Sequence, residues 1–453
     1  MRRVLVLVIM MLGIAGIAAA EESLSLDQAI LRAIESHPSI KAAENRVRAA
    51  ESTEDRARAF RMPDLKLAEM FSYTDNPAEV FAFTLNQRRF DMNEFFQADP
   101  NVPDALDTWI TRLEFMQPVY TGGQLSHRNQ QAKLMVQASL LDLKQSVEQV
   151  VFDTAQAYAN TIKAREYAGV IRKARNTTAQ HVELAEHYAS EGMIVRADLL
   201  NAQVYLAKME EELVQAESNA ELARAALNFS MGIDQNLRFE LSDLPPAPPI
   251  QGPASEWIEK APDLRWDINA RRRELEAGIL EEKVATSGLK PEIGIVGHYD
   301  LYDDGIFGSK GHSGSLMAVA GIKLFHGGAE RAEAAAARYT AKAGEQQITH
   351  FAEGIRLQTR QAWSELETAK KRHETATKSL DASREALRVR EERFRQGLDK
   401  MIDLLDAETS LQGTEVRELV ARFDLVLANF KLHLNSGRSL AEALNISLPK
   451  ENN

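Results

Sequence analysis

The chain has 453 residues, carries 54 Lys and Arg against 66 Asp and Glu, and contains no cysteine. The lack of cysteine excludes disulfide frameworks, thiolate zinc sites, iron-sulfur clusters and cysteine nucleophiles. The formal net charge of -12 argues against a nucleic-acid partner, because binding to phosphates requires a basic face.

The N-terminus has the form of a secretory signal peptide. Two arginines at positions 2 and 3 precede an apolar run over residues 4–17, and three alanines follow at 18–20. We therefore assign residues 1–20 to a signal peptide and expect an exported protein. No later run of 18 apolar residues occurs, so we expect that the mature chain does not cross a membrane by helices.

An internal repeat is the most informative feature of the sequence. The segment Gln-Pro-Val-Tyr-Thr-Gly-Gly at 117–123 returns as Ile-Lys-Leu-Phe-His-Gly-Gly at 322–328, an offset of 205 positions. The same offset relates Ala132 to Ala337, Thr154 to Thr359, Tyr158 to Trp363, Gly192 to Gly397, Asp198 to Asp403, Leu227 to Leu432 and Gly232 to Gly437. We infer that the chain is a tandem duplication.

The repeat divides the mature chain into two halves, 21–240 and 254–445. Between them, residues 241–253 hold five prolines and predict an extended connector. A polar tail, 446–453, follows the second half. Each half has the same predicted order of helix, strand, loop, strand, long helix, turn and helix.

Long helical hairpins are predicted over about 123–232 and 328–437. The first arm of each runs for about 70 residues without proline and is rich in good helix formers. Helices of that length persist only by packing along others, which predicts coiled-coil-like contacts. Gly192 and Gly397 lie where each long arm reverses, a usual place for a residue with positive φ. At the start of the first half, Ser25 and Gln28 have the spacing of a capping box.

Four strands are predicted, at about 65–73, 109–120, 292–302 and 316–325. The second and third alternate apolar and polar residues, as membrane strands do, whereas the first and fourth alternate less clearly. Four strands cannot close a barrel, and open strand edges are not tolerated in lipid. Three chains would give twelve strands, the smallest multiple expected to leave a lumen. The predicted fold is therefore mostly α with a small β part, in which a trimeric 12-stranded β-barrel is continued by a long α-helical, coiled-coil-like tunnel.

Several features resemble the TolC family of outer-membrane efflux proteins, the outer membrane factors of Gram-negative bacteria. They are the duplicated layout, the Tyr/Phe-x-Gly-Gly motif after the second strand of each half, and the run Gly-Leu-Asp-Lys-Met-Ile-Asp-Leu-Leu-Asp-Ala at 397–407. The resemblance implies a homotrimeric channel in the cell outer membrane with a large periplasmic portion. It would be the passive exit duct of a tripartite efflux or type I secretion system, in contact with outer-membrane lipid. Its partners would be a periplasmic adaptor (membrane fusion) protein and an inner-membrane pump of RND, ABC or MFS type.

The resemblance also implies a periplasmic gate at the hairpin tips. Asp403 and Asp406 would form acidic rings in the trimer, and their i,i+3 spacing places both on one helix face. Asp198 is the matching position of the first repeat. The alternative for all three is an ordinary solvated helix face. Where the best-known member of the family has a tyrosine and an arginine that latch the gate, this chain has Phe394 and Asp399.

Lys400 follows directly and is a candidate partner of Asp198. The same resemblance assigns adaptor docking to two glycine-apolar tips, Gly192-Met193 and Gly397-Leu398. A plain helix C-cap is the alternative for these tips, and both roles are compatible.

The loop 75–107 between the first two strands is much longer than its counterpart at 303–315 and carries five phenylalanines. It would either fold over the mouth of the barrel or pack against its rim. We find no catalytic, metal or cofactor-binding signature, and the ten histidines are scattered. We therefore expect no enzyme activity, no metal and no cofactor. The alternative function is a soluble periplasmic helical adaptor or scaffold.

Overall fold

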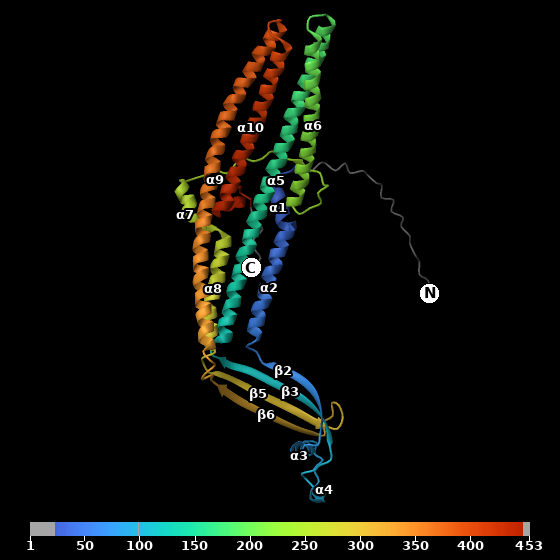
Figure 1. Ribbon diagram of the computed structural model, residues 1–453, viewed down its shortest axis with the longest axis vertical. Helices are drawn as coiled ribbons and strands as arrows, with labels where there is room; N and C mark the ends of the chain where they lie inside the picture. Colours follow the sequence, from blue (N-terminus) through green and yellow to red (C-terminus); the bar gives the residue numbers. More distant parts are fainter. Residues whose placement is uncertain (1–22, 98, 447–453) are drawn as a thin grey trace, which may run out of the picture. The chain divides into compact units, whose positions relative to one another are not determined.

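A computed structural model describes residues 23–97 and 99–446 (Figure 1). The expected signal peptide at 1–20 and all but the first residue of the expected tail at 446–453 lie outside the described residues. The chain divides into two compact units. The first comprises the described residues up to Ile40, Val147–Ile258 and those from Gln358 onward, and the second comprises Lys41–Ser146 and Glu259–Leu357.

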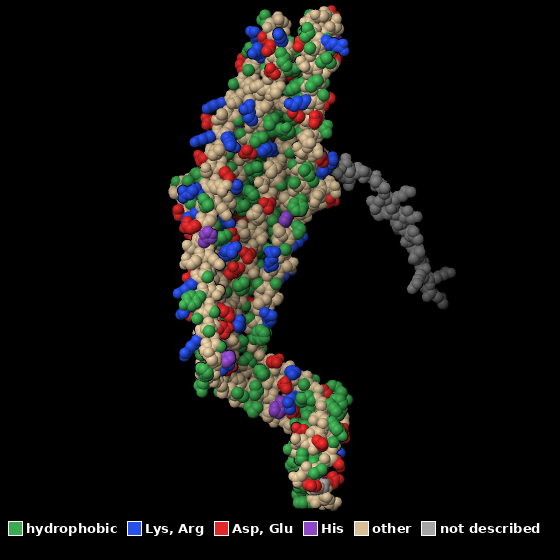
Figure 2. Space-filling model, viewed as in Figure 1, with side chains coloured by type: hydrophobic (Ala, Val, Ile, Leu, Met, Phe, Trp, Pro, Cys, Tyr) green, Lys and Arg blue, Asp and Glu red, His purple; other side chains and the backbone are tan. Residues whose placement is uncertain are grey.

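The first unit is almost entirely helical. It contains α1 (Leu26–Ser36), the first part of α7 (Ala254–Leu264), the short α11 (Leu440–Ala443), and the two hairpins. The hairpins are the distal part of α5 (Gln124–Ser190) with α6 (Arg196–Ser230), and the distal part of α9 (Ala329–Arg395) with α10 (Met401–Ser436). Two short strands, β1 (Ser23–Leu24) and β4 (Glu240–Leu241), pair in parallel. In Figure 2, acidic and basic side chains are intermingled along these helices.

The second unit joins helices to a sheet. Its helices are most of α2 (Pro38–Ala59), α8 (Trp266–Ser287) and the remaining parts of α5, α7 and α9. The sheet has four antiparallel strands in the order β2 (Asp64–Thr74), β3 (Leu106–Thr121), β5 (Glu292–Asp303) and β6 (Gly311–Gly321). None of the described helices is both long and apolar enough to cross a membrane.

The segment 75–107 differs from the predicted loop, because it contains two helices, α3 (Pro77–Asn86) and α4 (Met92–Gln97). The side chain of Asn76 accepts hydrogen bonds from the backbone N–H groups of Ala78 and Glu79 at the start of α3. Proline follows Asn76 at the first helical position, where its missing N–H costs nothing. These local signals start a helix that the strand-to-strand topology did not predict.

The duplication is visible in the backbone. α5 and α9 each span 67 residues, and their first residues are Gln124 and Ala329, which keeps the offset of the sequence repeat. The same hydrogen bond recurs in both hairpins. The hydroxyl of Thr154 donates to the carbonyl of Ser230 at 3.2 Å, and the hydroxyl of Thr359 donates to that of Asn435 at 3.0 Å. Each bond ties the long arm of a hairpin to the end of its short arm.

The sheet has one polar and one apolar face. Strand register places on the polar face the side chains of Lys66, Arg112, Glu114, His298, Asp300, Tyr302, Ser313 and Ser315. It places on the opposite face the side chains of Leu65, Leu67, Phe71, Tyr73, Trp109, Leu113, Phe115, Ile293, Ile295, Tyr299, Leu301 and Leu316. The alternation extends through β2 except at Glu69, which lies on the apolar face, and it stops in β6 at Met317 and Val319, which lie on the same face as Ser313 and Ser315. The period of two along each strand produces this division.

The proline-rich connector packs on the first unit. Asn429 of α10 donates to the carbonyl of Pro248 at 2.8 Å, and the indole of Trp257 donates to that of Gln251 at 2.8 Å. The buried hydroxyl of Tyr158 lies 2.8 Å from the Leu24 carbonyl oxygen, in the strand pair formed by β1 and β4. Burial raises the pKa of Tyr158 to about 12. The connector is thus held in place, although it forms no regular element after Leu241.

Candidate functional site

The predicted gate lies at the tips of the two hairpins, where each long arm reverses. Gly192 and Gly397 have φ values of 74° and 71°. The N–H of Met193 donates to the carbonyl of Tyr188 at 2.8 Å, and the N–H of Leu398 donates in the same way to Arg393 at 2.9 Å. This is the hydrogen-bond pattern of a Schellman cap, which needs a residue that tolerates positive φ.

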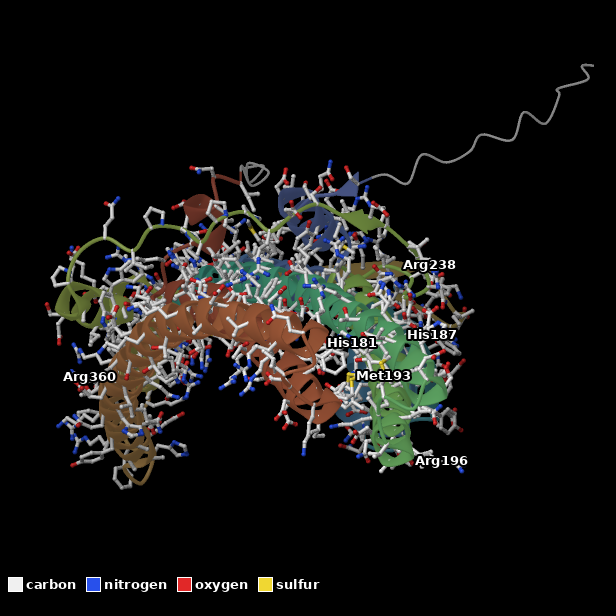
Figure 3. All side chains as sticks on the ribbon, turned by 90° about the horizontal axis from the view of Figure 1, so that it is seen from above. His181, His187, Met193, Arg196, Arg238 and Arg360 are labelled. Atoms are coloured by element: carbon white, nitrogen blue, oxygen red, sulfur yellow. The ribbon has the colours of Figure 1, made fainter. Side chains whose placement is uncertain are left out.

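Large apolar side chains are exposed at both tips, Met193 and Val195 at the first and Leu398 and Ile402 at the second. Met193 and Leu398 are each 62% exposed. Figure 3, which looks along the helices, labels Met193 and Arg196 at the tip of the first hairpin. The glycines therefore cap the helices, and the apolar residue that follows each of them is exposed. The two alternatives that the sequence left open for the tips are compatible.

The aspartates of the predicted ring have different surroundings. The carboxylate of Asp403 accepts a hydrogen bond from the backbone N–H of Lys400 at 3.1 Å, at the N-terminus of α10. A negative charge in the first turn is favourable there because of the helix dipole. Asp406 is exposed one turn further along, and Asp198 lies half-buried in the first turn of α6.

The suggested pairing of Lys400 with Asp198 is not formed within residues 23–97 and 99–446. The charged contact at this tip belongs to Asp399 instead. Its carboxylate lies 3.0 Å from Arg390 Nη1 and 2.9 Å from Arg393 Nε, and its side chain is only 5% exposed. Hydrogen bonds from these two guanidinium groups lower the pKa of Asp399, and the Asp399 carboxylate raises the pKa of Arg390. Asp399 thus closes the turn of its own hairpin.

An apolar core joins the two hairpins just behind their tips. Phe394 is buried and its ring centroid lies 6.1 Å from that of Tyr188. The buried members of the core are Val182, Ala185, Ala202, Phe394, Met401, Leu404 and Leu405. Because they come from α5, α6, α9 and α10, the position where the family latch has a polar residue is here part of an apolar contact between hairpins.

Two polar contacts lie beside this core. His181 Nε2 of α5 lies 2.6 Å from Glu408 Oε1 of α10. The hydroxyl of Thr409, also on α10, donates to the hydroxyl of Tyr205 on α6 at 2.9 Å. No sequence signal identified His181 or Glu408, because the two residues are far apart in the chain and neither belongs to a recognisable motif.

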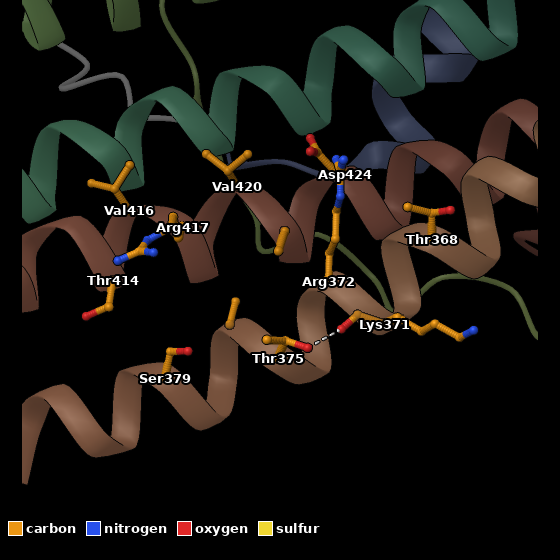
Figure 4. Close-up of a pocket in the computed structure, with 12 residues that line it drawn as sticks. Thr368, Lys371, Arg372, Thr375, Ser379, Thr414, Val416, Arg417, Val420 and Asp424 are labelled. Atoms are coloured by element: carbon orange, nitrogen blue, oxygen red, sulfur yellow. Dashed lines mark hydrogen bonds between the residues drawn. The ribbon is translucent and has the colours of Figure 1, made fainter.

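A groove runs between α9 and α10 further from the tips (Figure 4). It has a volume of about 570 Å³. The side chains labelled along it include Thr368, Arg372, Thr375 and Ser379 of α9, and Val420 and Asp424 of α10. Except for Arg372, these α9 side chains are small and project little from the helix into the groove.

The helices α9 and α6 form the two ends of the row of hairpin helices, with α5 and α10 between them, as Figures 1 and 3 both show. The end helix α6 buries one face against its neighbours but exposes five large apolar side chains elsewhere. They are Leu200, Val204, Val214, Leu222 and Phe229, and their exposure lies between 50% and 70%. At 3.6 residues per turn these positions fall on one face, which we call the α6 stripe.

In the part of the chain that the structure describes, no group of three or more His, Asp or Glu side chains is placed to hold a metal ion. The features that distinguish the tips are therefore geometric and electrostatic: two capped turns, an apolar core between hairpins, and carboxylates at the start of α6 and α10.

Comparisons with known proteins agree with this architecture. The family of outer membrane efflux proteins matches residues 29–233 and 257–438. The outer membrane efflux protein BepC of Brucella suis is 20% identical over 347 residues, which cover 76% of this chain and 75% of BepC.

Solved structures show the same fold. A membrane protein from Pseudomonas aeruginosa superposes with a TM-score of 0.78 at 18% identity, covering 91% of this chain and 90% of the other. The outer membrane protein VceC of Vibrio cholerae superposes with a TM-score of 0.75 at 18% identity, covering 91% of this chain and 96% of VceC. These matches confirm the predicted family, the mostly helical fold class with a small sheet, the efflux function and the outer-membrane location. The chain belongs to the outer membrane efflux protein family.

Proposed function

We propose that three copies of this chain form the passive exit duct of a tripartite efflux or type I secretion system. The duct would lead substrates from the periplasm, or from an inner-membrane pump, to the exterior. In this proposal, residues 1–20 are removed as a signal peptide, and 21–240 and 254–445 are the two repeats on either side of the connector 241–253.

The sheet supports assembly from several chains. In one chain it is open, because β2 and β6 are its two edge strands. Unpaired edges are not tolerated in lipid, and twelve strands from three copies would enclose a lumen. The apolar face, with Leu67, Leu113 and Leu316 exposed, suits contact with outer-membrane lipid. The polar face would then line the water-filled interior.

The α6 stripe carries the proposal for the helical part. An exposed apolar stripe along a 35-residue helix is the mark of a missing helical partner. At the other end of the row, α9 offers small exposed residues along the open groove that it forms with α10, among them Thr368 and Thr375. Large residues on one helix and small residues on the other interlock well. We therefore place α6 of each copy against α9 of the next, which closes the row into a tube.

Charge supports the same pairing. Glu211 lies within the α6 stripe, Lys371 lies at the groove of α9 and Lys378 lies two turns further along α9, all three exposed. Opposite charges flanking an apolar seam set register and partner choice between helices. The closed arrangement is cyclic and heterologous, so each copy uses both of its end helices.

At the periplasmic end, we propose that Asp403, Asp406 and Asp198 line a narrow acidic constriction, with Lys400 beside it. Rings of carboxylates favour cations and repel anions. The apolar core around Phe394 would hold the two hairpins of each copy together in the closed state. Opening the duct then requires the hairpins to separate at this core.

The exposed tips are the proposed docking site for a periplasmic adaptor protein. Gly192 with Met193, and Gly397 with Leu398, each present a turn and an exposed apolar side chain. The pump would be an inner-membrane transporter of RND, ABC or MFS type, joined to the duct through that adaptor. The energy for transport would come from the pump, since the duct carries no nucleotide or metal motif.

The mass of the detergent-purified full chain tests the proposed assembly. We expect a trimer for the wild type and dissociation when Val214→Glu and Leu222→Glu place charges in the α6 stripe. A matched control is Asn201→Glu with Asn219→Glu, two exposed positions on the same helix outside the stripe. The control should remain trimeric. Equal dissociation of both variants, or a monomeric wild type, would refute the proposed use of α6.

A further inference from the structure

The long connection between β2 and β3 crosses the polar face of the sheet. Its helix α3 contacts β3 and also β6, the far edge strand, at the end of the sheet opposite the long helices. β2 and β3 are neighbours in the sheet, so a short connection could join them without contacting β6. The longer path over the sheet therefore indicates a role beyond joining the two strands.

One anchor of α3 is the residue that follows it. Gln87 is almost completely buried, and its amide donates to the hydroxyl of Thr108 at 2.8 Å and to the carbonyl of Asp107 at 3.1 Å. Thr108 is fully buried. It lies four residues before Arg112 in β3, so its side chain is on the same, polar face of the sheet. The anchor thus fixes the end of α3 over that face.

Three further contacts fix α3 to β5 and β6. The ring of Phe83 lies 6.4 Å from the ring of Tyr302 on β5. The guanidinium of Arg88 lies 3.2 Å from the ring nitrogen of His312 on β6. The backbone of Asn86 lies so close to Gly311, the first residue of β6, that a Cβ added there would overlap the Asn86 carbonyl oxygen. Only glycine leaves room for the helix at this point.

The anchored segment ends in a cluster of phenylalanines. The ring of Phe81 lies 5.6 Å from Phe90 and 5.6 Å from Phe95, and Phe95 lies 5.8 Å from Phe96. Such pairs stabilise a small unit beyond their buried area. Yet Phe81, Leu85, Met92 and Phe96 remain exposed. Four exposed apolar side chains on one short segment form a patch that needs a role.

Resting on the proposed duct, we propose that residues 75–97 and 99–105 form a second constriction, at the outer mouth of the pore, that limits the size of the solutes passing through it. The polar face lines the lumen in that duct, and the contacts of Phe83, Asn86 and Gln87 place the segment over this face. Arg88 instead reaches around the edge of β6 to His312, whose side chain lies on the opposite face. The body of the segment therefore projects into the lumen. Three copies bring three aromatic clusters to one mouth. An apolar constriction resists the passage of water and ions by dewetting and excludes large solutes by its width.

The absence of cysteine from the chain provides a direct test. Met317 lies on the polar face of β6 and is exposed, so Met317→Cys introduces a single thiol in the proposed lumen. Intact cells producing the full chain are treated from outside with a small impermeant maleimide or with the same maleimide on a polyethylene glycol chain. We expect the small reagent to label the thiol and the large one to be excluded.

Displacing α3 should remove that exclusion. In the Met317→Cys background, Gly311→Ala forces the backbone of Asn86 away, and we expect the large reagent to label several-fold faster. The matched control is Gly321→Ala, at the other end of the same strand, where an added Cβ meets no atom within 4 Å. It should keep the slow rate. Gln87→Ala removes the anchor without touching the strands and should act like Gly311→Ala.

The outcomes separate the two proposals. Rapid labelling of the parent Met317→Cys protein by the large reagent, or identical rates for Gly311→Ala, Gln87→Ala and Gly321→Ala, would overturn the outer constriction and leave the duct intact. If neither reagent labels Met317→Cys in intact cells while both do so in broken cells, the polar face is not open to the exterior, and both proposals are wrong. Labelling by the small reagent shows in each variant that the protein is assembled.

Discussion

His181 and Glu408, one from each hairpin, form a close and largely buried pair. Their Nε2 and Oε1 atoms are 2.6 Å apart, and the side chains are 15% and 8% exposed. A buried pair of this kind contributes little to stability compared with an apolar pair, but removal of one partner is costly. We expect the pair to act as a latch between the hairpins, in a chain that has Phe394 and Asp399 at the positions of the family's latch residues.

We expect His181→Ala to loosen the contact between hairpins, because it leaves the Glu408 carboxylate buried without its partner. A hydrogen bond to a charged group contributes about 1.5 to 3 kcal/mol. Single-channel conductance in planar bilayers should rise, and the double variant with Glu408→Ala should be less perturbed than the sum of the two single variants. Arg388→Ala, which breaks an exposed pair with Glu385 within α9, is the control. Equal conductance for His181→Ala and this control would contradict the latch.

We expect Phe394→Ala to open a cavity in the apolar core behind the tips. Truncation of a buried phenylalanine costs about 3 to 5 kcal/mol of stability. We expect this loss to lower the free energy needed to open the tips locally. Amide hydrogen exchange over residues 390–405 should become faster, whereas exchange around Thr154 should not change. Phe394→Leu keeps most of the volume and should give a smaller effect. Uniform exchange rates along both hairpins would show that the core does not hold the tips.

Acid should weaken the first unit through His433. This side chain is buried, makes no hydrogen bond to any described residue, and packs edge-on against Trp257 at 5.3 Å. Burial, with a smaller effect from nearby Arg438, lowers the pKa of His433 to about 4. The neutral ring is therefore the folded form, and stability is complete above the ordinary pKa of about 6.5. It falls as the pH drops from there toward the folded pKa, by about 3 kcal/mol in total.

His433→Gln should reduce this loss between neutral pH and about pH 4, as measured by denaturant unfolding of the full chain. The substitution removes the ionisable ring, so part of the pH dependence should disappear whatever the change in overall stability. His350→Gln, at an exposed histidine on α9, should retain the pH dependence of the wild type. If the two variants lose stability in parallel on acidification, His433 is not the group responsible.

Local patterns predicted much of the fold. The positive φ of Gly192 and Gly397 and the capping box of Ser25 follow from the sequence, because each depends on residues close in the chain. The polar and apolar faces of β2 and β6 did not, since a strand's face is decided by cross-strand register. The pairing of His181 with Glu408 also depends on helix packing over more than two hundred residues.

The site followed the same division. The sequence predicted the tips and their aspartates. It did not predict the contacts of Asp399, because the orientation of a side chain in a loop is not fixed by the local sequence. It offered Lys400 as a partner for Asp198, whereas the charged contacts at this tip join Asp399 to Arg390 and Arg393. The helix α3 was missed because Asn76 and Pro77 start a helix in a segment that topology treats only as a strand connection.

In the proposed trimer the chain is a cation-favouring duct gated at its hairpin tips. The most direct test is the reversal potential of the purified full-length protein in planar bilayers under a potassium chloride gradient. We predict discrete conductance with a reversal potential toward that of potassium, which moves toward zero when Asp403 and Asp406 are both replaced by alanine. The absence of discrete conductance, or a reversal potential that the double replacement leaves unchanged, would contradict the account.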